Sequence, residues 1–197
     1  MRVAHKIDFI NQANLVTTFT SAAIDLKQMG GYSLHAVWDV NTPAAKVFTA
    51  AASDICTAAS HGYTTGLKGQ ASTTTTLPAG LALTTDYFVI VLDANTFKLA
   101  SSLANAIAGT AIDITDAGTG THTFTPTALA GGAAKLQKSN DAIDWIDVTS
   151  SSQSITADGS YMWEVVDAQY AFARVHATLT AGRLTLNAHL CAKGESV

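Results

Sequence analysis

The sequence predicts an all-β protein: an antiparallel β-sandwich with a small β-rich domain inserted in one of its loops. Only 13% of the residues are charged, fewer than in a typical globular domain, and Thr, Ser and Ala take their place. Among these, Thr prefers β-strands. Apolar and polar residues alternate over several short stretches, with the period of a half-buried strand. Between Val40 and Gly131 the composition shifts to Thr, Ala and Gly, as expected for an insertion at a loop tip.

The clearest strand before the insertion is "YSLHAVWDV", residues 32–40. Its alternation places Tyr32, Leu34, Ala36 and Trp38 on one face. Pro43 and the small residues around it break the pattern. A short helix over "AAIDLKQM", residues 22–29, remains an open alternative to a strand upstream.

The predicted insert spans residues 48–128 and contains a hairpin. The apolar runs "DYFVIVLD" and "NTFKLAS" are joined by "DAN", in which Asp93 and Asn95 suit a tight turn. A helix of one or two turns follows, with Ser101 or Ser102 as its N-cap and Gly109 as its stop. "TAIDITDAGTGTHTFTP" then predicts a strand, a Gly-rich turn and another strand.

The sandwich resumes after "LAGGAA", so residues 1–47 and 129–197 form one discontinuous domain. "KLQKSNDAIDWIDV" predicts a strand, a polar turn and a second strand. In the last hairpin, alternate Ala, Val and Leu residues form one face on either side of Gly182. We expect Val40 and Gly131 to end and begin adjacent strands, which would bring the ends of the insert together.

The charge pattern argues against nucleic-acid and membrane partners. The net charge is −4, the pI is about 5.8, and the eleven Lys and Arg residues are scattered singly. No stretch approaches the ~20 apolar residues of a membrane span, and the N-terminus has no apolar export segment. Cys56 and Cys191 lack a CxxC partner, so we expect buried, reduced thiols in a protein that folds in a reducing cytosol.

No catalytic motif is present, and we expect neither enzymatic activity nor a cofactor. His35, His176 and His189 lie on predicted strands, where they are either ordinary strand residues, the favoured interpretation, or converging metal ligands. His61 and His122 are expected to form a hydrogen-bonding pair that holds the ends of loops. The three tryptophans, Trp38, Trp145 and Trp163, are expected in the core, whereas a sugar-stacking platform would need one of them exposed.

Two parts of the chain resemble known families. The segment Ala52 to Thr125, with "SHGYTTG", "LPAGLALTTDYFVIVLDANTFKLASSLANAIAGTAIDI" and "GTGTHTF", resembles a β-rich module of tailed-bacteriophage virion proteins, notably tail and fibre proteins. The flanking halves resemble phage structural proteins with an "LQxSNDGxxWxDV" turn and are similar to discoidin-like jelly rolls. The matching stretches are "LQKSNDAIDWIDV", Leu136 to Val148, and "YAFARV", Tyr170 to Val175. Ala142 stands where Gly is usual, so a positive φ there would strain it.

Discoidin-like domains sometimes hold calcium in their loops, and Asn140, Asp141, Asp144 and Asp147 crowd this turn. The same residues close turns by bonding their own backbone, which we favour, so no metal is expected.

The resemblance implies a jelly-roll-like sandwich and a virion component without catalytic activity. We expect a capsid decoration, cement or head-fibre protein, made in the host cytoplasm and carried in the virion. It would form a homo-oligomer, with a trimer favoured, and contact other virion proteins such as the major capsid protein or tail proteins. The alternatives are a tail or tail-fibre component, or a carbohydrate-binding or adhesin module with a loop pocket at one end of the sandwich.

Overall fold

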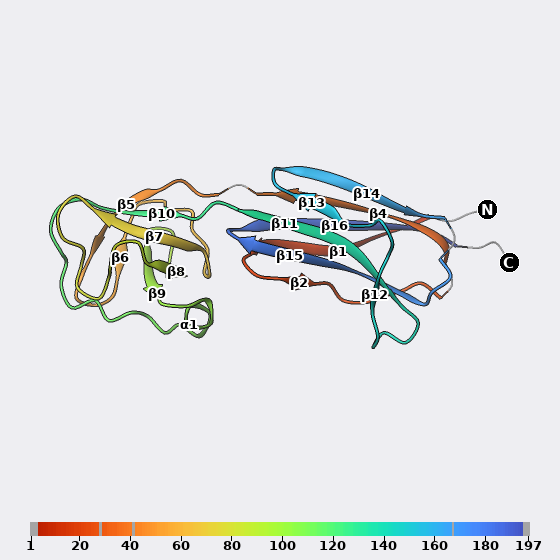
Figure 1. Ribbon diagram of the computed structural model, residues 1–197, viewed down its shortest axis with the longest axis horizontal. Coiled ribbons are helices and arrows are strands. Elements are labelled where there is room, and N and C mark those ends of the chain that lie inside the picture. Colours follow the sequence, from red (N-terminus) through yellow and green to blue (C-terminus); the bar gives the residue numbers. More distant parts are fainter. Residues whose placement is uncertain (1–3, 28, 41, 167, 195–197) are drawn as a thin grey trace. The chain divides into compact units, whose positions relative to one another are not determined.

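The computed structural model describes residues 4–27, 29–40, 42–166 and 168–194 (Figure 1). The chain divides into an outer unit, Met1–Asn41 with Leu129–Val197, and an inserted unit, Thr42–Ala128. The first border lies at 41/42, whereas the composition had suggested 47/48. One reason is that β5 (Lys46–Ala50) pairs from its first residue with β10 (His122–Pro126). In addition, the Tyr63 hydroxyl of the inserted unit donates to the carbonyl of Ala44.

The outer unit is a sandwich of two antiparallel sheets. The first has the order β1-β16-β4-β14, from Ala4–Leu15, Leu184–Gly194, Met29–Asp39 and Gly159–Val165. The second has the order β12-β11-β15-β2, from Ile146–Asp147, Gly131–Ser139, Phe172–Ala181 and Phe19–Thr20. Two short strands extend its edges: β13 (Gln153–Ile155) pairs with β11, and β3 (Ile24–Asp25) pairs with β15.

This strand order is that of a jelly roll. β2 and β3 lie along the same side of β15, and β12 and β13 along the same side of β11, so each pair acts as one interrupted strand. Numbered in chain order, the eight resulting strands form two sheets with the orders 1-8-3-6 and 2-7-4-5. Two interlocked Greek keys produce this order, which confirms the predicted antiparallel, jelly-roll-like sandwich.

The predicted alternation is what fills the core between these sheets. On β15, Ala173, Val175 and Ala177 are buried, and on β16 the alternate residues from Leu184 to Leu190 are fully buried. Trp38 and Trp163 also lie in this core, at 7% and 5% exposure. Their indole N–H groups donate to the carbonyl oxygens of Ala157 and Ser151, so neither is left unpaired.

The inserted unit is a closed barrel with the strand order β10-β5-β6-β9-β8-β7. The strands not yet given are β6 (Cys56–Thr57), β7 (Lys68–Thr73), β8 (Asp86–Val91) and β9 (Thr96–Ala100). Phe48, Phe97 and Phe124 fill its interior, each 2% exposed or less. Gly69 on β7 makes room for Phe124, because a Cβ there would lie 2.6 Å from that ring.

The predicted hairpin and helix are both confirmed. β8 and β9 pair from Phe88↔Ala100 to Val91↔Phe97, and the Asp93 carboxylate accepts the turn N–H groups of Asn95 and Thr96. Helix α1 (Leu103–Ala108) begins after Ser102, whose hydroxyl accepts the N–H of Asn105. It ends at Gly109 with φ 74°.

The helix left open over residues 22–29 is wrong, because Ile24–Asp25 form β3 against β15 and Met29 begins β4. Within the described residues, no helix is long and apolar enough to cross a membrane.

Candidate functional site

The turn between β11 and β12 is built around two side chains, Ser139 and Asp141. The Ser139 hydroxyl is buried, donates to Oδ1 of Asp141 at 2.8 Å, and accepts the N–H of Ala142 at 2.9 Å. The same Oδ1 accepts the N–H groups of Ile143 at 2.8 Å and Asp144 at 2.9 Å. Asp141 therefore closes the turn by bonding its own backbone.

These bonds also set the charge of the turn. The N–H of Ile143, followed by that of Asp144 and the Ser139 hydroxyl, holds the pKa of the Asp141 carboxyl below its ordinary value. Asp147, at the end of the turn, receives the Lys135 ammonium at 2.7 Å and the Gln137 amide at 3.0 Å, one on each oxygen. Both carboxylates are thus ionised at neutral pH and have partners inside the chain.

Ala142 adopts the left-handed conformation that the missing glycine would have favoured. Its φ is 61°, a conformation that is sterically unfavourable for a residue with a Cβ. The strain expected from alanine at a glycine position is therefore present. Its carbonyl accepts the indole N–H of Trp145 at 3.1 Å. This bond fixes Trp145 at the turn, outside the core in which it was expected, and the prediction of a core position is wrong for this residue.

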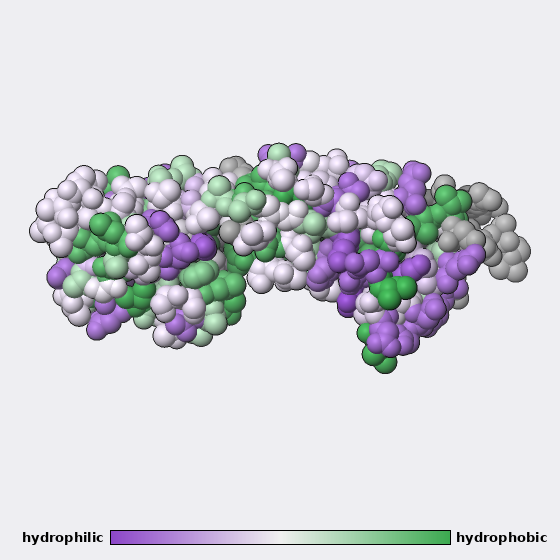
Figure 2. All heavy atoms as spheres, viewed as in Figure 1, coloured by the Kyte–Doolittle hydropathy of each residue, from purple (hydrophilic) through white to green (hydrophobic). Residues whose placement is uncertain are grey.

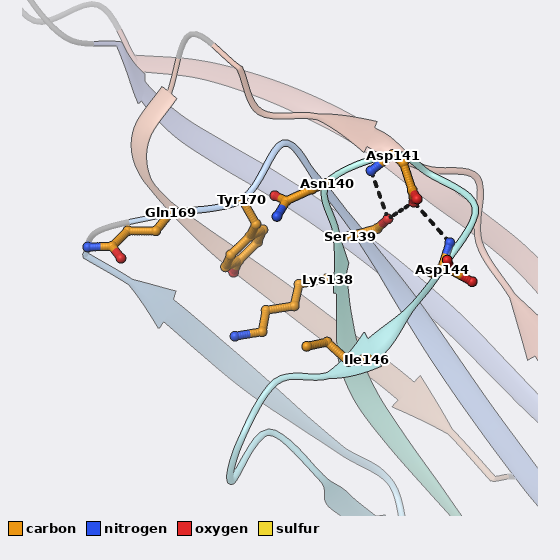
Figure 3. Close-up of a pocket in the computed structure, with 8 residues that line it drawn as sticks. All are labelled: Lys138, Ser139, Asn140, Asp141, Asp144, Ile146, Gln169 and Tyr170. Carbon is orange, nitrogen blue, oxygen red and sulfur yellow. Dashed lines mark hydrogen bonds between the residues drawn. The ribbon is translucent and has the colours of Figure 1, made fainter.

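A pocket of about 540 Å³ lies beside this turn (Figure 3). Its walls come from the end of β11, the turn, β12 and the segment before β15. The lining residues are Lys138, Ser139, Asn140, Asp141, Asp144, Ile146, Gln169 and Tyr170. Amide, ammonium, carboxylate and phenol groups thus surround one aromatic ring and one aliphatic side chain, and the volume is within the range of small-ligand sites.

The side of the pocket formed by Tyr170 is fixed by a hydrogen bond to a tyrosine of the core. The Tyr170 hydroxyl lies 2.7 Å from the hydroxyl of Tyr32, which is 4% exposed at the edge of the core. Burial raises the pKa of both phenols, more strongly for Tyr32. The Lys138 ammonium lies 5.6 Å from the centre of the Tyr170 ring, so the ring also faces a cation.

The outer face of the second sheet carries a stacked and ion-paired network. The Arg174 guanidinium lies 4.1 Å from the centre of the Trp145 ring, and its Nε donates to Gln137 at 2.8 Å. Desolvation lowers the pKa of Arg174 from its ordinary value, and the guanidinium keeps its charge at neutral pH. The "YAFARV" strand thus contributes its arginine to the same turn that the sequence singled out.

His176 lies next to this network on β15. Its Nδ1 is 2.9 Å from the hydroxyl of Thr20. Desolvation, followed by the charges of Lys135 and Arg174, lowers the pKa of its imidazole. The side chain is therefore neutral at pH 7.

The three strand histidines do not converge. His35 on β4 and His189 on β16 are register partners in the first sheet, whereas His176 belongs to the second. Among the residues that the structure describes, no group of three or more His, Cys, Asp and Glu is placed to hold a metal ion. The geometry therefore lends no support to the open alternative of a three-histidine site.

His61 and His122 hold loops of the barrel separately and do not act as the expected pair. His61 lies 3.0 Å from the Asp93 carbonyl and accepts the N–H of Tyr63. His122 lies 2.9 Å from the Thr73 hydroxyl and 3.0 Å from the Ala117 carbonyl. Both rings are buried against phenylalanines.

Both cysteines are free thiols; Cys56 is buried, as expected, whereas Cys191 is only partly buried. Burial raises the pKa of the Cys56 thiol to about 12, so it stays protonated and unreactive inside the barrel.

Sequence reasoning identified the turn, and it included a loop pocket only in the carbohydrate-binding alternative, without its residues. It missed the Tyr32–Tyr170 bond. The two tyrosines are 138 residues apart in the chain, and no local pattern links them. A signal was present in "QYAFARV", where an aromatic residue precedes the strand that carries Arg174.

The fold and this site define a jelly-roll protein with an inserted six-stranded barrel and a polar pocket at one loop. No family model and no curated protein matches the chain. Among solved structures, it is similar to the VP16-VP17 complex, a complex of the two major capsid proteins of bacteriophage P23-77. That match has 10% identity and a TM-score of 0.26, over 98% of this chain and 99% of that chain. A second match is VP17, a capsid protein of the same bacteriophage, with 9% identity, a TM-score of 0.25, and 100% and 97% of the two chains covered. A likeness this weak carries no argument about fold or function.

Proposed function

We propose that this chain is a structural component of a bacteriophage virion, most specifically a capsid decoration, cement or head-fibre protein. It would act by self-association and by contact with neighbouring virion proteins, not by catalysis. The proposal starts from the resemblance carried by "LQKSNDAIDWIDV" and by the inserted segment. A jelly roll suits this function because it presents broad, rigid sheet faces and loop ends to its neighbours.

The observation that carries the proposal is the exposure of large apolar side chains, seen as green areas in Figure 2, in a chain of which only 13% of the residues are charged. In the outer unit, Val166, Ile143, Ile146 and Met162 are 89%, 79%, 63% and 50% exposed. In the inserted unit, Ile107 and Val47 are 71% and 61% exposed. A partner that covers these side chains would remove their apolar surface from water, which favours association.

The carboxylate beside the pocket supports a non-catalytic interpretation. A general base works best with a pKa near the operating pH and with a free lone pair. Asp141 has a lowered pKa, and its Oδ1 already accepts three hydrogen bonds within the turn. The role of this carboxylate is therefore to stabilise the turn.

Antibody labelling of particles tests the proposal. Virions of the phage that encodes this chain would be decorated with an antibody against it and imaged in negative stain. Label at regular positions on the head is expected, label on the tail would favour the tail or tail-fibre alternative, and unlabelled particles that also lack the chain by mass spectrometry would overturn a virion role. Light scattering of the purified chain would give its oligomeric state, for which a trimer is expected.

Carbohydrate binding is a second candidate, favoured by the pocket. Asn140, Lys138 and Tyr170 place an amide, an ammonium and an aromatic ring around about 540 Å³, groups that can bond and stack on a sugar. A glycan array probed with the wild-type chain and with Lys138→Ala would test it. Binding lost in the variant would support this candidate, and no binding by the wild-type chain would exclude it for the glycans on the array.

A further inference from the structure

The two sheets of the outer unit have four edges, and three of them are blunted. β2 and β3, and β12 and β13, are two or three residues long. β1 is long, but its register against β16 shifts twice, between Asp8 and Ile10 and between Gln12 and Leu15. Short strands and bulges of this kind prevent a sheet edge from pairing with another chain.

The fourth edge, β14, has none of these features. It pairs with β4 over seven consecutive residues, from Gly159↔Trp38 to Val165↔Tyr32, without a shift. Within the described residues it is the last strand of its sheet, so its outer side presents unpaired backbone groups. Its sequence, "GSYMWEV", contains no Lys, Arg or Pro.

Two large apolar side chains of this edge are exposed. Tyr161 is 39% exposed on the core side of the strand, where its ring lies 5.3 Å from that of Trp163. Met162 is 50% exposed on the outer face, in register with His35. Glu164 is the one charged residue in the strand.

We propose that β14 pairs with β14 of a second copy of this chain, antiparallel, about a two-fold axis that passes through Met162. This register places Met162 opposite its own copy, Tyr161 opposite the second copy's Trp163, and Ser160 opposite Glu164. The two four-stranded sheets then form one continuous sheet. The hydroxyl of Ser160 can donate to the Glu164 carboxylate of the second copy.

The position of Glu164 favours this register over the parallel pairing and over the adjacent antiparallel registers. A parallel, in-register pair would bring the two copies of Glu164 together. An antiparallel pair centred on Tyr161 would place Glu164 opposite Asp158, also with like charges facing. An antiparallel pair centred on Trp163 would place Glu164 opposite Met162, whose side chain has no hydrogen-bond donor for the carboxylate. Like charges that face each other across strands are destabilising, so self-complementarity points to a second copy as the occupant.

This inference rests on the self-association in the proposed function and specifies one surface for it. A trimer formed through other surfaces would leave β14 free, and the two-fold contact would then join two trimers. The wild-type chain would have the mass of a hexamer where β14 pairs, and that of a trimer where it does not.

Cysteine cross-linking tests the register directly. In the Met162→Cys variant, the two introduced thiols would face each other with Cα atoms ~4.5–5.5 Å apart, which a disulfide can bridge. The matched control, Ser160→Cys, lies on the same strand and face, but its two copies would be four residues apart, about 13 Å, which is too far. Mixing Ser160→Cys with Glu164→Cys should restore the cross-link. The unmodified chain gives the background from Cys56 and Cys191.

We expect Met162→Cys to give covalent dimers on a non-reducing gel under mild oxidation, with Ser160→Cys at background. Met162→Lys, which places two ammonium groups on the axis, should lower the mass measured by light scattering by a factor of two, with unchanged circular dichroism. An oligomer that keeps its mass in Met162→Lys, and that gives no covalent dimer in Met162→Cys, would overturn the β14 contact and leave the proposed function standing. A wild-type chain that is monomeric at high concentration, together with a Met162→Cys variant that does not cross-link, would overturn both. Equal cross-linking of both single variants would also overturn the stated register.

Discussion

The Arg174 guanidinium stacks 4.1 Å from the centre of the Trp145 ring, and this contact ties the turn after β11 to the strand β15. Arg174 also donates from Nε to Gln137, and Trp145 donates to the carbonyl of Ala142. The turn that forms one wall of the pocket is therefore held from the outer face of the sheet as well as by its own backbone bonds.

Arg174→Lys should weaken this attachment. Lysine keeps the charge but loses the planar stacking and the Nε–H donor, so we expect the free energy of unfolding of the outer unit to fall by roughly 0.5–1 kcal/mol. Urea unfolding followed by tryptophan fluorescence measures it. Arg183→Lys is the matched control and should change little. An equal loss in both variants would contradict a specific Arg174–Trp145 contribution.

Tyr170→Phe should cost more, because it leaves the buried Tyr32 hydroxyl without its partner. An unsatisfied buried hydroxyl costs about 1–3 kcal/mol, and we expect a loss of this size in the free energy of unfolding. The double variant Tyr32→Phe/Tyr170→Phe removes both polar groups and should recover part of the loss. A double variant whose loss is the sum of the two single losses would show that the hydroxyls are not coupled.

The same tyrosines predict a loss of stability in alkali. Burial raises the pKa of Tyr32 and Tyr170, and that of Tyr63 in the barrel to about 12. The unfolded chain releases these protons near pH 10, whereas the folded chain retains them, so stability is unaffected below pH 10 and falls as the pH rises above it. Urea midpoints between pH 8 and pH 11.5 would show this. In Tyr32→Phe/Tyr170→Phe the decline should be shallower, and an unchanged slope would contradict the assignment.

Ala142→Gly should stabilise the outer unit. Glycine adopts φ 61° without the steric cost that alanine has there, and this gain exceeds the greater flexibility of glycine in the unfolded chain. We expect roughly 0.5–1 kcal/mol, measured by thermal or urea unfolding. Ala157→Gly, at an exposed position outside the positive-φ residues, is the control and should be neutral or destabilising. A loss in Ala142→Gly would indicate that the turn does not hold this conformation.

Removal of divalent metal should leave the melting temperature unchanged. Three of the oxygens that calcium could use are already engaged: Oδ1 of Asp141 by the turn, and both oxygens of Asp147 by Lys135 and Gln137. Melting with excess chelator and with added calcium measures this. A decrease of several degrees with chelator, reversed by calcium, would identify the loop as a calcium site.

The strands could be predicted where one face is buried, because burial imposes the alternation seen on β15 and β16. The helix α1 and the β8–β9 turn could be predicted from Ser102, Gly109 and Asp93, whose bonds are local. The assignment of each strand to one of the two sheets could not be predicted, because it depends on pairing between residues far apart in the chain. His35 and His189 share a row that no spacing encodes, and Tyr32 meets Tyr170 only once the sheets close. Trp145 was misplaced because its alternation with apolar neighbours resembles that of a core residue, whereas Arg174 covers it from outside.

The inserted unit should be removable without loss of the outer fold. The core clusters do not mix: one contains only outer-unit residues, and the other two contain only residues between Phe48 and Phe124. However, β4 and β11 lie in different sheets, so the expectation that Val40 and Gly131 bound adjacent strands is wrong. The replacement must cross the sandwich, a span of ~10 Å, which needs a flexible linker of roughly six to eight Gly and Ser residues.

We expect the outer unit, with residues 42–128 replaced by such a linker, to show β-sheet circular dichroism and a cooperative melt. A shorter connection reduces the entropic free-energy cost of closing the loop, by roughly 0.6 kcal/mol for each halving of its length. The outer unit should therefore be at least as stable as before. The matched control has a two-residue linker, which is too short to join the two sheets and should aggregate or melt without cooperativity. Residues 42–128 expressed alone should also fold, because the barrel closes on itself and leaves no open edge. A molten product from the long-linker chain would mean that the two units depend on each other for folding, and the two-domain organisation would be refuted.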